Sequence, residues 1–158
     1  MRILYSLFLL FFFNTAFADP IIFGYYYEGN LIGDEHISIN FPSPPALVQS
    51  SGSNVYVAKD EEGTEFTLSA FQVPHSDYDV SEAIQSLIAS VEESKTKTLI
   101  SAINGVIVWS ENNKITQLMI IPSNYFIYFL TTTSGIQDEE KARAFANSFL
   151  VTAEFTLA

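Results

Sequence analysis

Residues 99–132 read LISAINGVIVWSENNKITQLMIIPSNYFIYFLTT, and this stretch contains three apolar segments that are separated by short polar turns. Runs of β-branched and aromatic residues bounded by turn residues are typical of strands, so we predict strands over 99–110, 114–121 and 125–132. The intervening triplets Glu-Asn-Asn and Pro-Ser-Asn are too short for a crossover connection. The stretch therefore predicts an antiparallel meander.

Amphipathic helices are predicted on both sides of this meander. Before it, Asp79 and Glu82 stand three residues apart in a capping-box pattern, and apolar residues follow at helical spacing up to Val91. After it, the acidic residues 138–140 stand where the helix dipole favours negative charge. The second helix then shows one apolar face, which consists of Ala142, Phe145, Ala146, Phe149 and Leu150. Residues 151–157 follow as a predicted edge strand.

Strands are also predicted before the first helix. Residues 37–41 alternate apolar and polar side chains, and residues 55–58 and 64–71 are predicted to form a hairpin around a polar turn. The proline-rich segment 42–53 is predicted to cross the surface as a loop. Strands, a helix, a meander and a second helix do not follow the alternating order of a parallel α/β sheet, so we predict an α+β domain.

The N-terminal segment has the features of a secretory signal peptide. Arg2 precedes an apolar run over residues 3–13, and Ala16 and Ala18 occupy the −3 and −1 positions of a cleavage site. The apolar run is shorter than the roughly 20 residues that cross a bilayer. We therefore predict a signal peptide over residues 1–18, a single domain over 19–158, no membrane span in the mature chain, and a periplasmic or secreted location.

Composition excludes several classes of function. The chain has 158 residues, with 7 Lys and Arg against 18 Asp and Glu, and its formal charge is −11. Such an acidic chain is not expected to bind nucleic acid, because phosphate binding needs a basic face. Cysteine is absent from the sequence, which excludes disulfides, thiolate metal sites and cysteine nucleophiles. The sequence also lacks a phosphate-binding glycine loop, a dinucleotide fingerprint and a zinc-helix motif, so no cofactor and no metal is predicted.

The order and spacing of several short motifs resemble those of the Mog1/PsbP-like group, in particular its small exported bacterial proteins. The motifs are the strand end Phe41-Pro42, the segment 66–71 before the first helix, Gly105, the aromatic segment 124–128 and the closing helix 144–149. This resemblance implies an α/β/α sandwich around a mainly antiparallel sheet. It also implies a binding or assembly module without a catalytic constellation, and it assigns no specific binding residue.

Aromatic residues gather near the start of the predicted domain and in the last meander strand. Because successive strand residues point to opposite faces, these side chains cannot all enter one core. Helices on both faces would bury both sets, whereas an exposed groove would use some tyrosines as interface anchors. On the second reading, the protein binds a protein partner through an aromatic-rich surface. The residues assigned to this surface are Tyr25, Tyr26, Tyr27, Tyr125 and Tyr128.

An enzymatic function is the alternative. His36 and His75 each stand near carboxylates, so either could join an acid–base pair or a metal site. Neither metal-ligand spacing nor a nucleophile elbow accompanies them. The acidic residues within 60–65 fit a solvated turn better than a calcium loop. We therefore predict a protein without catalytic residues, with a small exported hydrolase or metal-dependent enzyme as the alternative.

Overall fold

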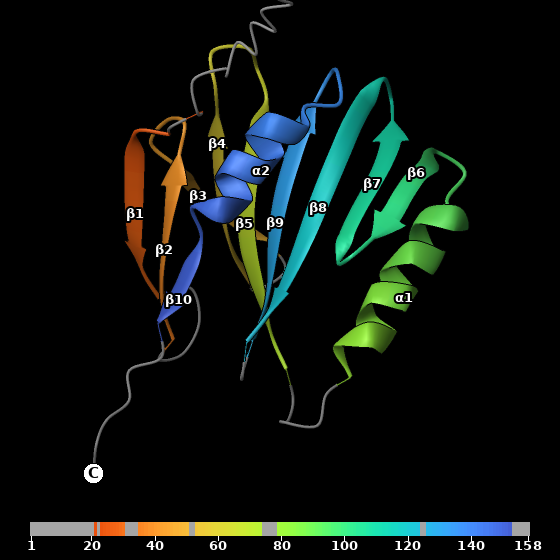
Figure 1. Cartoon of the computed structure of the whole chain (residues 1–158), viewed down its shortest axis with the longest axis horizontal. Helices are drawn as coiled ribbons and strands as arrows, with labels where there is room; N and C mark the ends of the chain where they lie inside the picture. The colour runs from red at the N-terminus through yellow and green to blue at the C-terminus, as the bar shows by residue number, and fades with distance from the viewer. Residues whose placement is uncertain are drawn as a thin grey trace, which may run out of the picture.

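The structure is a computed structural model that describes residues 21, 23–30, 35–50, 53–73, 79–123 and 126–152. Within these residues, ten strands form two antiparallel sheets, and two helices pack on the larger sheet (Figure 1). The predicted α+β class is confirmed. The predicted signal peptide and its cleavage site lie outside the described residues.

The larger sheet has seven strands in the described part of the chain, and each neighbouring pair is antiparallel. Its order is β3-β4-β5-β9-β8-β7-β6. The strands are β3 (Ala46–Ser50), β4 (Ser53–Lys59), β5 (Glu65–Gln72), β6 (Lys97–Ile103), β7 (Val106–Glu111), β8 (Lys114–Pro122) and β9 (Phe126–Ser134). The pairing of β5 with β9 joins the predicted hairpin to the predicted meander, so both belong to one sheet.

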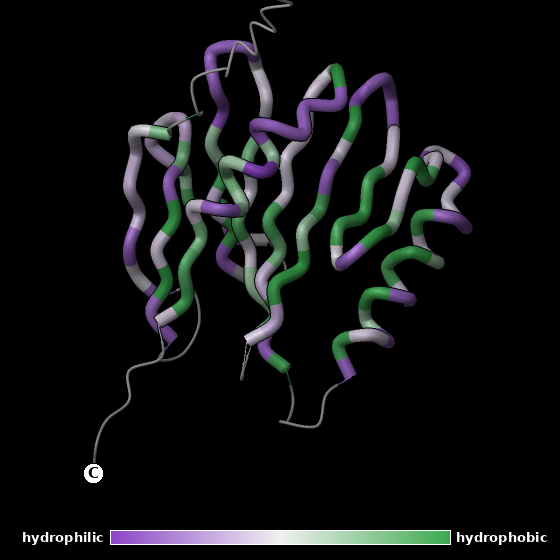
Figure 2. The backbone as a smooth tube through the Cα atoms, in the orientation of Figure 1, coloured by the Kyte–Doolittle hydropathy of each residue, from purple (hydrophilic) through white to green (hydrophobic). Residues whose placement is uncertain are grey.

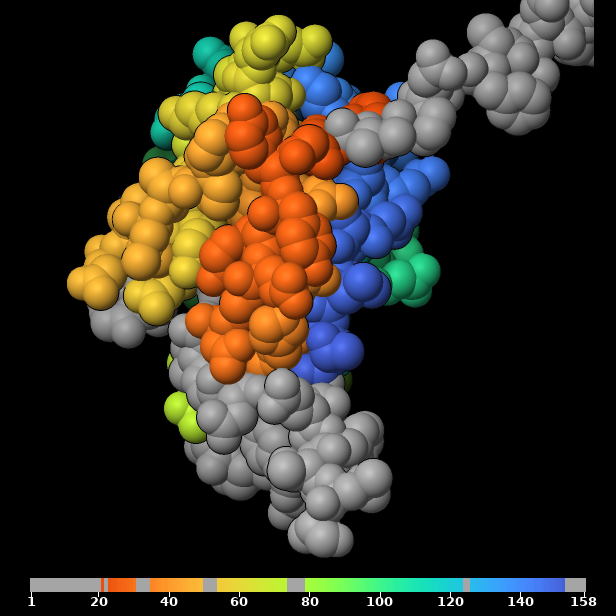
Figure 3. Space-filling view, turned by 90° about the vertical axis from the view of Figure 1, so that its left-hand side faces the viewer, coloured from red at the N-terminus to blue at the C-terminus, as the bar shows by residue number. Residues whose placement is uncertain are grey.

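A smaller sheet has the order β1-β2-β10 and consists of β1 (Tyr25–Gly29), β2 (His36–Phe41) and β10 (Leu150–Thr152). The predicted strand over 37–41 is confirmed, and β10 confirms the start of the predicted edge strand. Figure 3 shows β1 and β2 on one face of the molecule, between β3 and β4 on one side and the C-terminal elements on the other.

Both helices begin at an aspartate that caps them. In α1 (Val80–Glu92), Asp79 Oδ1 accepts a hydrogen bond from the backbone N–H of Ser81 at 2.8 Å. In α2 (Glu139–Asn147), Asp138 Oδ1 accepts one from the backbone N–H of Lys141 at 3.0 Å. Side-chain acceptors at this position satisfy N–H groups that the helix itself leaves unpaired. The two predicted helix starts are therefore confirmed.

The two helices lie on opposite faces of the larger sheet. Alternate residues of β9 show this, since Tyr128 belongs to the core under α2, whereas Ile127 and Phe129 belong to the core under α1. The core under α2 also contains Phe66 and Phe145, whose rings are 5.2 Å apart. Apolar residues recur along β7, β8 and α1 in Figure 2, as burial on both sheet faces requires. The predicted helix–sheet–helix sandwich is therefore present.

Two of the predicted strand boundaries are wrong. The segment predicted as one strand over 99–110 forms two strands, β6 and β7, which are joined at Asn104 and Gly105. Both residues have positive φ, 52° and 78°, which is the backbone of a type I′ hairpin turn. The segment predicted as a surface loop over 42–53 contains β3, which pairs with β4 at the edge of the sheet. Neither helix in the described part of the chain has the length and apolar character of a membrane-crossing helix.

Candidate functional site

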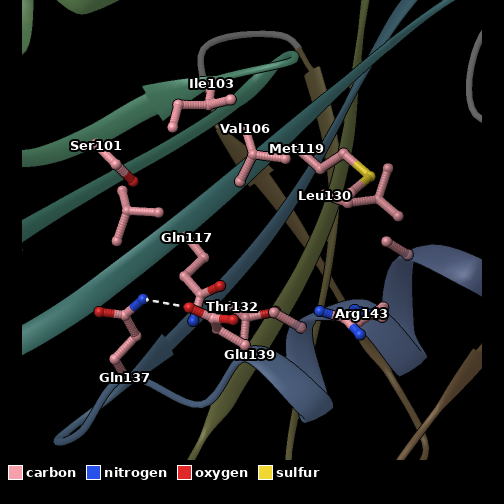
Figure 4. Close-up of a pocket in the computed structure, with 13 residues that line it drawn as sticks. Ser101, Ile103, Val106, Gln117, Met119, Leu130, Thr132, Gln137, Glu139 and Arg143 are labelled. Atoms are coloured by element: carbon pink, nitrogen blue, oxygen red, sulfur yellow. Dashed lines mark hydrogen bonds between the residues drawn. The ribbon is translucent and has the colours of Figure 1, made fainter.

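A cavity of about 250 Å³ lies between α2 and the face of the sheet formed by β6, β7, β8 and β9 (Figure 4). Since α2 covers only part of this face, the strands toward the β6 edge leave a hollow beside the helix. Pockets of a few hundred Å³ that combine apolar walls with a few polar groups are the usual small-ligand sites. We therefore describe this cavity as the candidate site.

Two cross-strand rows of side chains form the floor of the cavity. The antiparallel register places these residues side by side on neighbouring strands, with the rows two residues apart. The apolar row consists of Ile103, Val106, Met119 and Leu130, and the polar row of Ser101, Val108, Gln117 and Thr132. The cavity is therefore amphipathic, with an apolar half and a hydrogen-bonding half.

A β-bulge in β6 determines which of its side chains reach the cavity. The register shifts between Leu99 and Ser101, so that Leu99 pairs with Trp109 while Ser101 pairs with Val108. Leu99 and Trp109 pack in the core under α1, on the opposite face. In a regular strand Leu99 and Ser101 would share a face, because they are two residues apart. The bulge therefore turns the end of β6 toward the cavity.

Two side chains of the polar row are largely buried but keep polar atoms that open into the cavity. Gln117 is 8% exposed and Thr132 is 4% exposed, yet neither side chain bonds to any described residue. No fully enclosed side-chain polar atom of the described residues lacks a partner, so these polar atoms must be reached from the cavity. Figure 4 shows Gln117 on β8 with its side chain directed toward Thr132 and Glu139. Because these polar atoms open into the cavity, they are able to form hydrogen bonds with a ligand there.

Helix α2 supplies the opposite wall and the rim. Ala142 and Ala146 form the apolar wall. At the rim, the side-chain amide Nε2 of Gln137 donates to Glu139 Oε1 at 2.9 Å. Arg143 stands one helical turn after Glu139, also at the rim, and forms no ion pair or hydrogen bond with the described residues. The rim therefore presents one carboxylate and one guanidinium that are not paired with each other.

The other side of α2 is fixed by a cluster of charges. Lys141 Nζ lies 2.7 Å from Asp60 Oδ2 and 2.5 Å from Glu62 Oε2, and its side chain is mostly buried. Burial opposes ionisation of Asp60, but the hydrogen bonds from Lys141 and from the backbone N–H of Thr64 outweigh it and hold the pKa of Asp60 below its usual range. This cluster holds α2, which forms one wall of the cavity, against the turn between β4 and β5.

The structure separates the five predicted tyrosines. Tyr25 and Tyr26 are exposed, with 47% and 64% of their surface accessible. Tyr27 is half-buried and donates from its hydroxyl to the hydroxyl of Tyr56 at 2.8 Å. Tyr128 is 1% exposed and lies in the core under α2. Tyr125 lies outside the described residues.

Tyr128 is therefore no surface group in this structure, and its hydroxyl donates to Glu35 Oε2 at 2.7 Å. Burial, followed by the hydrogen bond to Glu35, raises the pKa of Tyr128 above its ordinary value. Among the four of these tyrosines that the structure describes, Tyr25 and Tyr26 are exposed, and both lie in edge strand β1. The binding role assigned to these residues stays a prediction.

The residues of the enzymatic alternative do not form a cluster. His36 Nε2 lies 2.7 Å from Glu28 Oε1, in a cross-strand contact between β1 and β2 at the surface. Its neighbour in sequence, Glu35, is buried and bonds to Tyr128 instead. His75 lies outside the described residues. Within the residues that the structure describes, no group of three or more histidines and acids could hold a metal ion.

Gln117, Thr132 and the rim residues were not predicted from the sequence. The sequence nevertheless contains a usable signal. Alternate residues of a strand share a face, so Gln117 lies on the same face as Met119 and Ile121. A polar residue on a face that is otherwise apolar is the pattern that a buried binding group leaves.

Comparison with known proteins adds one structural likeness. No protein-family model matches the chain, and no curated protein matches it in sequence. The crystal structure of LpqN, which is involved in cell envelope biogenesis of Mycobacterium tuberculosis, is similar over 82% of this chain and 93% of that chain. The sequence identity is 15% and the TM-score is 0.45. Since these values carry no inference about family or function, the site is interpreted from its own geometry.

Proposed function

We propose that this chain is an exported, non-catalytic binding module and that the cavity between α2 and the sheet binds its ligand. The observation that carries the proposal is the pair of largely buried side chains, Gln117 and Thr132, whose polar atoms open into the cavity beside its apolar half and form no hydrogen bond with the described residues. Polar atoms that open into a cavity can form hydrogen bonds to a ligand, and such bonds contribute about 0.5–1.5 kcal/mol each. The cavity thus favours an amphipathic ligand over a purely apolar one.

Export and family membership are further parts of the proposal. Export is supported by the signal-like pattern of residues 1–18. Membership of the Mog1/PsbP-like group is supported by the motif order and by an antiparallel sheet with one helix on each face. A protein of that group would act by binding rather than by catalysis.

The cavity can be tested with a neutral apolar fluorophore, N-phenyl-1-naphthylamine, whose emission rises when it leaves water. Ser101→Trp places a large side chain on the floor of the cavity, and we expect it to abolish saturable binding of the fluorophore. Lys114→Trp is the matched control, because Lys114 is exposed at the start of β8 and does not line the cavity. Equal binding by both variants would remove the cavity as the binding site, provided that circular dichroism shows both to be folded.

A protein-binding surface at β1 is the second candidate, and the exposure of Tyr25 and Tyr26 favours it. Aromatic residues are typical anchors of interfaces, and β1 is the edge strand of the smaller sheet. We expect a Tyr25→Ser, Tyr26→Ser double variant to lose a saturable protein partner in affinity capture from the exporting cell, whereas Ser101→Trp should keep it. Retention of the same partner by the double variant would exclude this surface.

A further inference from the structure

We propose that the ligand of the cavity is a short peptide with free termini and an apolar side chain, such as a dipeptide. This inference rests on the proposed function and names the ligand class for the same cavity. It follows from three properties of the site: the paired donor and acceptor character of the buried polar groups, the adjoining apolar row, and the two opposite charges at the rim.

The buried polar groups call for a ligand that both donates and accepts hydrogen bonds. The side-chain amide of Gln117 offers two N–H donors and a carbonyl acceptor, and the hydroxyl of Thr132 can do either. An ion or an alcohol alone would pair with only part of this set. A peptide group carries one N–H donor and one C=O acceptor, so it can form hydrogen bonds with both the carbonyl and the NH₂ group of a side-chain amide.

The apolar half of the cavity suits a hydrocarbon side chain. Val106, Met119 and Leu130 lie two residues further along the strands than the polar row, and Ala142 and Ala146 face them from α2. Methionine at the centre of this row adapts to ligands of different shapes. A leucine-sized side chain next to a peptide group would place its methyl groups on this row while its amide reaches Gln117.

The rim complements two opposite charges. Glu139 and Arg143 are four residues apart on α2, so their Cβ atoms are about 6 Å apart. A dipeptide in an extended conformation spans about 7 Å, which allows its ammonium group to approach Glu139 while its carboxylate approaches Arg143. The chain carries a formal charge of −11, which disfavours a simple anion, whereas a zwitterion adds no net charge.

The test is isothermal titration calorimetry of the purified chain with the dipeptide Leu-Leu. The comparison ligands are Gly-Gly, which lacks the apolar side chains, hexanoate, which lacks the amide, and acetyl-Leu-Leu-amide, which lacks both charges. We expect Leu-Leu to bind at least tenfold more tightly than each of the three. Gln117→Leu and Arg143→Gln should each weaken Leu-Leu binding about three- to tenfold, the range expected for one lost hydrogen bond. Lys114→Gln should leave it unchanged.

The outcomes separate this inference from the proposed function. If acetyl-Leu-Leu-amide binds as tightly as Leu-Leu, the charged termini do not contribute to binding. If hexanoate binds as tightly as Leu-Leu, the peptide group does not contribute. Either result contradicts the inference that the ligand is a dipeptide. If Leu-Leu fails to displace a fluorophore that Ser101→Trp excludes, the peptide inference is wrong and the cavity remains a binding site. If neither the fluorophore nor the dipeptide binds, both proposals fail. Circular dichroism of Gln117→Leu and Arg143→Gln excludes unfolding as the cause of lost binding.

Discussion

Replacement of Tyr128 by Phe isolates one hydrogen bond in the core without creating a cavity. The ring of Tyr128 is 1% exposed, and its hydroxyl donates to Glu35, which is 7% exposed, at 2.7 Å. Removing the hydroxyl leaves that Glu35 oxygen without its donor in a place where water has little access. A hydrogen bond to a charged group contributes about 1.5–3 kcal/mol, so we expect Tyr128→Phe to lower the free energy of unfolding by about 2 kcal/mol.

Urea denaturation followed by tryptophan fluorescence measures this loss. With an m-value of about 2 kcal/mol/M, a loss of about 2 kcal/mol moves the midpoint down by about 1 M urea. Tyr26→Phe is the control, because Tyr26 is exposed, and its free energy of unfolding should stay within about 0.5 kcal/mol of the parent chain. A Tyr128→Phe midpoint that coincides with the control, at an unchanged m-value, would refute the reasoning.

The same hydroxyl predicts how stability depends on alkaline pH. Burial and the contact with Glu35 raise the pKa of Tyr128 in the folded chain, and burial and the contact with Tyr56 do the same for Tyr27. The folded state therefore holds these protons more tightly than the unfolded state does. This contribution is complete below the ordinary tyrosine pKa of about 10 and is lost as the pH rises above it. The free energy of unfolding of Tyr128→Phe should therefore decrease less steeply than that of the parent chain between about pH 10 and 12.

Three further predictions concern the elements that shape the cavity. Gly105→Ala should cost about 1–2 kcal/mol in urea denaturation, because φ is +78° at the β6–β7 turn, whereas Gly24→Ala, where an added Cβ meets nothing within 4 Å, should be near neutral. Lys141→Met should lower the free energy of unfolding by about 2 kcal/mol at pH 7. Since Lys141 helps to lower the pKa of Asp60, the free energy of unfolding of the parent chain should decrease as the pH falls below about 4, and that of Lys141→Met should decrease less. Equal decreases in the free energies of unfolding of the two chains over this pH range would contradict the prediction.

The element types were predictable where the sequence carried a strong period. The capping box at Asp79 and the apolar spacing after it predicted α1, the acidic residues 138–140 with the apolar face after them predicted α2, and the alternation in 37–41 predicted β2, because these signals are local. The hairpin at Asn104 and Gly105 was missed, although Asn-Gly between apolar runs is a strong turn signal. The turn has only these two residues, and apolar residues flank it directly on both sides, so the segment resembles one long apolar strand.

The cavity could not be predicted, because it depends on long-range register. Gln117 and Thr132 become neighbours through the pairing of β8 with β9, and Ser101 reaches them through a bulge that the sequence does not mark. The tyrosines carried a strong compositional signal, but composition does not distinguish Tyr128, in the core, from Tyr26, at the surface. The rim depends on where α2 docks, which Phe145 in the core and Lys141 on the β4–β5 turn determine.

The most direct test of the central claim is a titration of the ¹⁵N-labelled chain with Leu-Leu, followed through the side-chain NH₂ signal of Gln117 and the backbone amides. If the cavity binds the dipeptide, that NH₂ signal and the amides of Val106, Met119 and Thr132 should shift along one saturable curve, while those of Tyr25 and Tyr26 stay fixed. Absence of a shift at Gln117, or shifts concentrated in β1, would contradict the account.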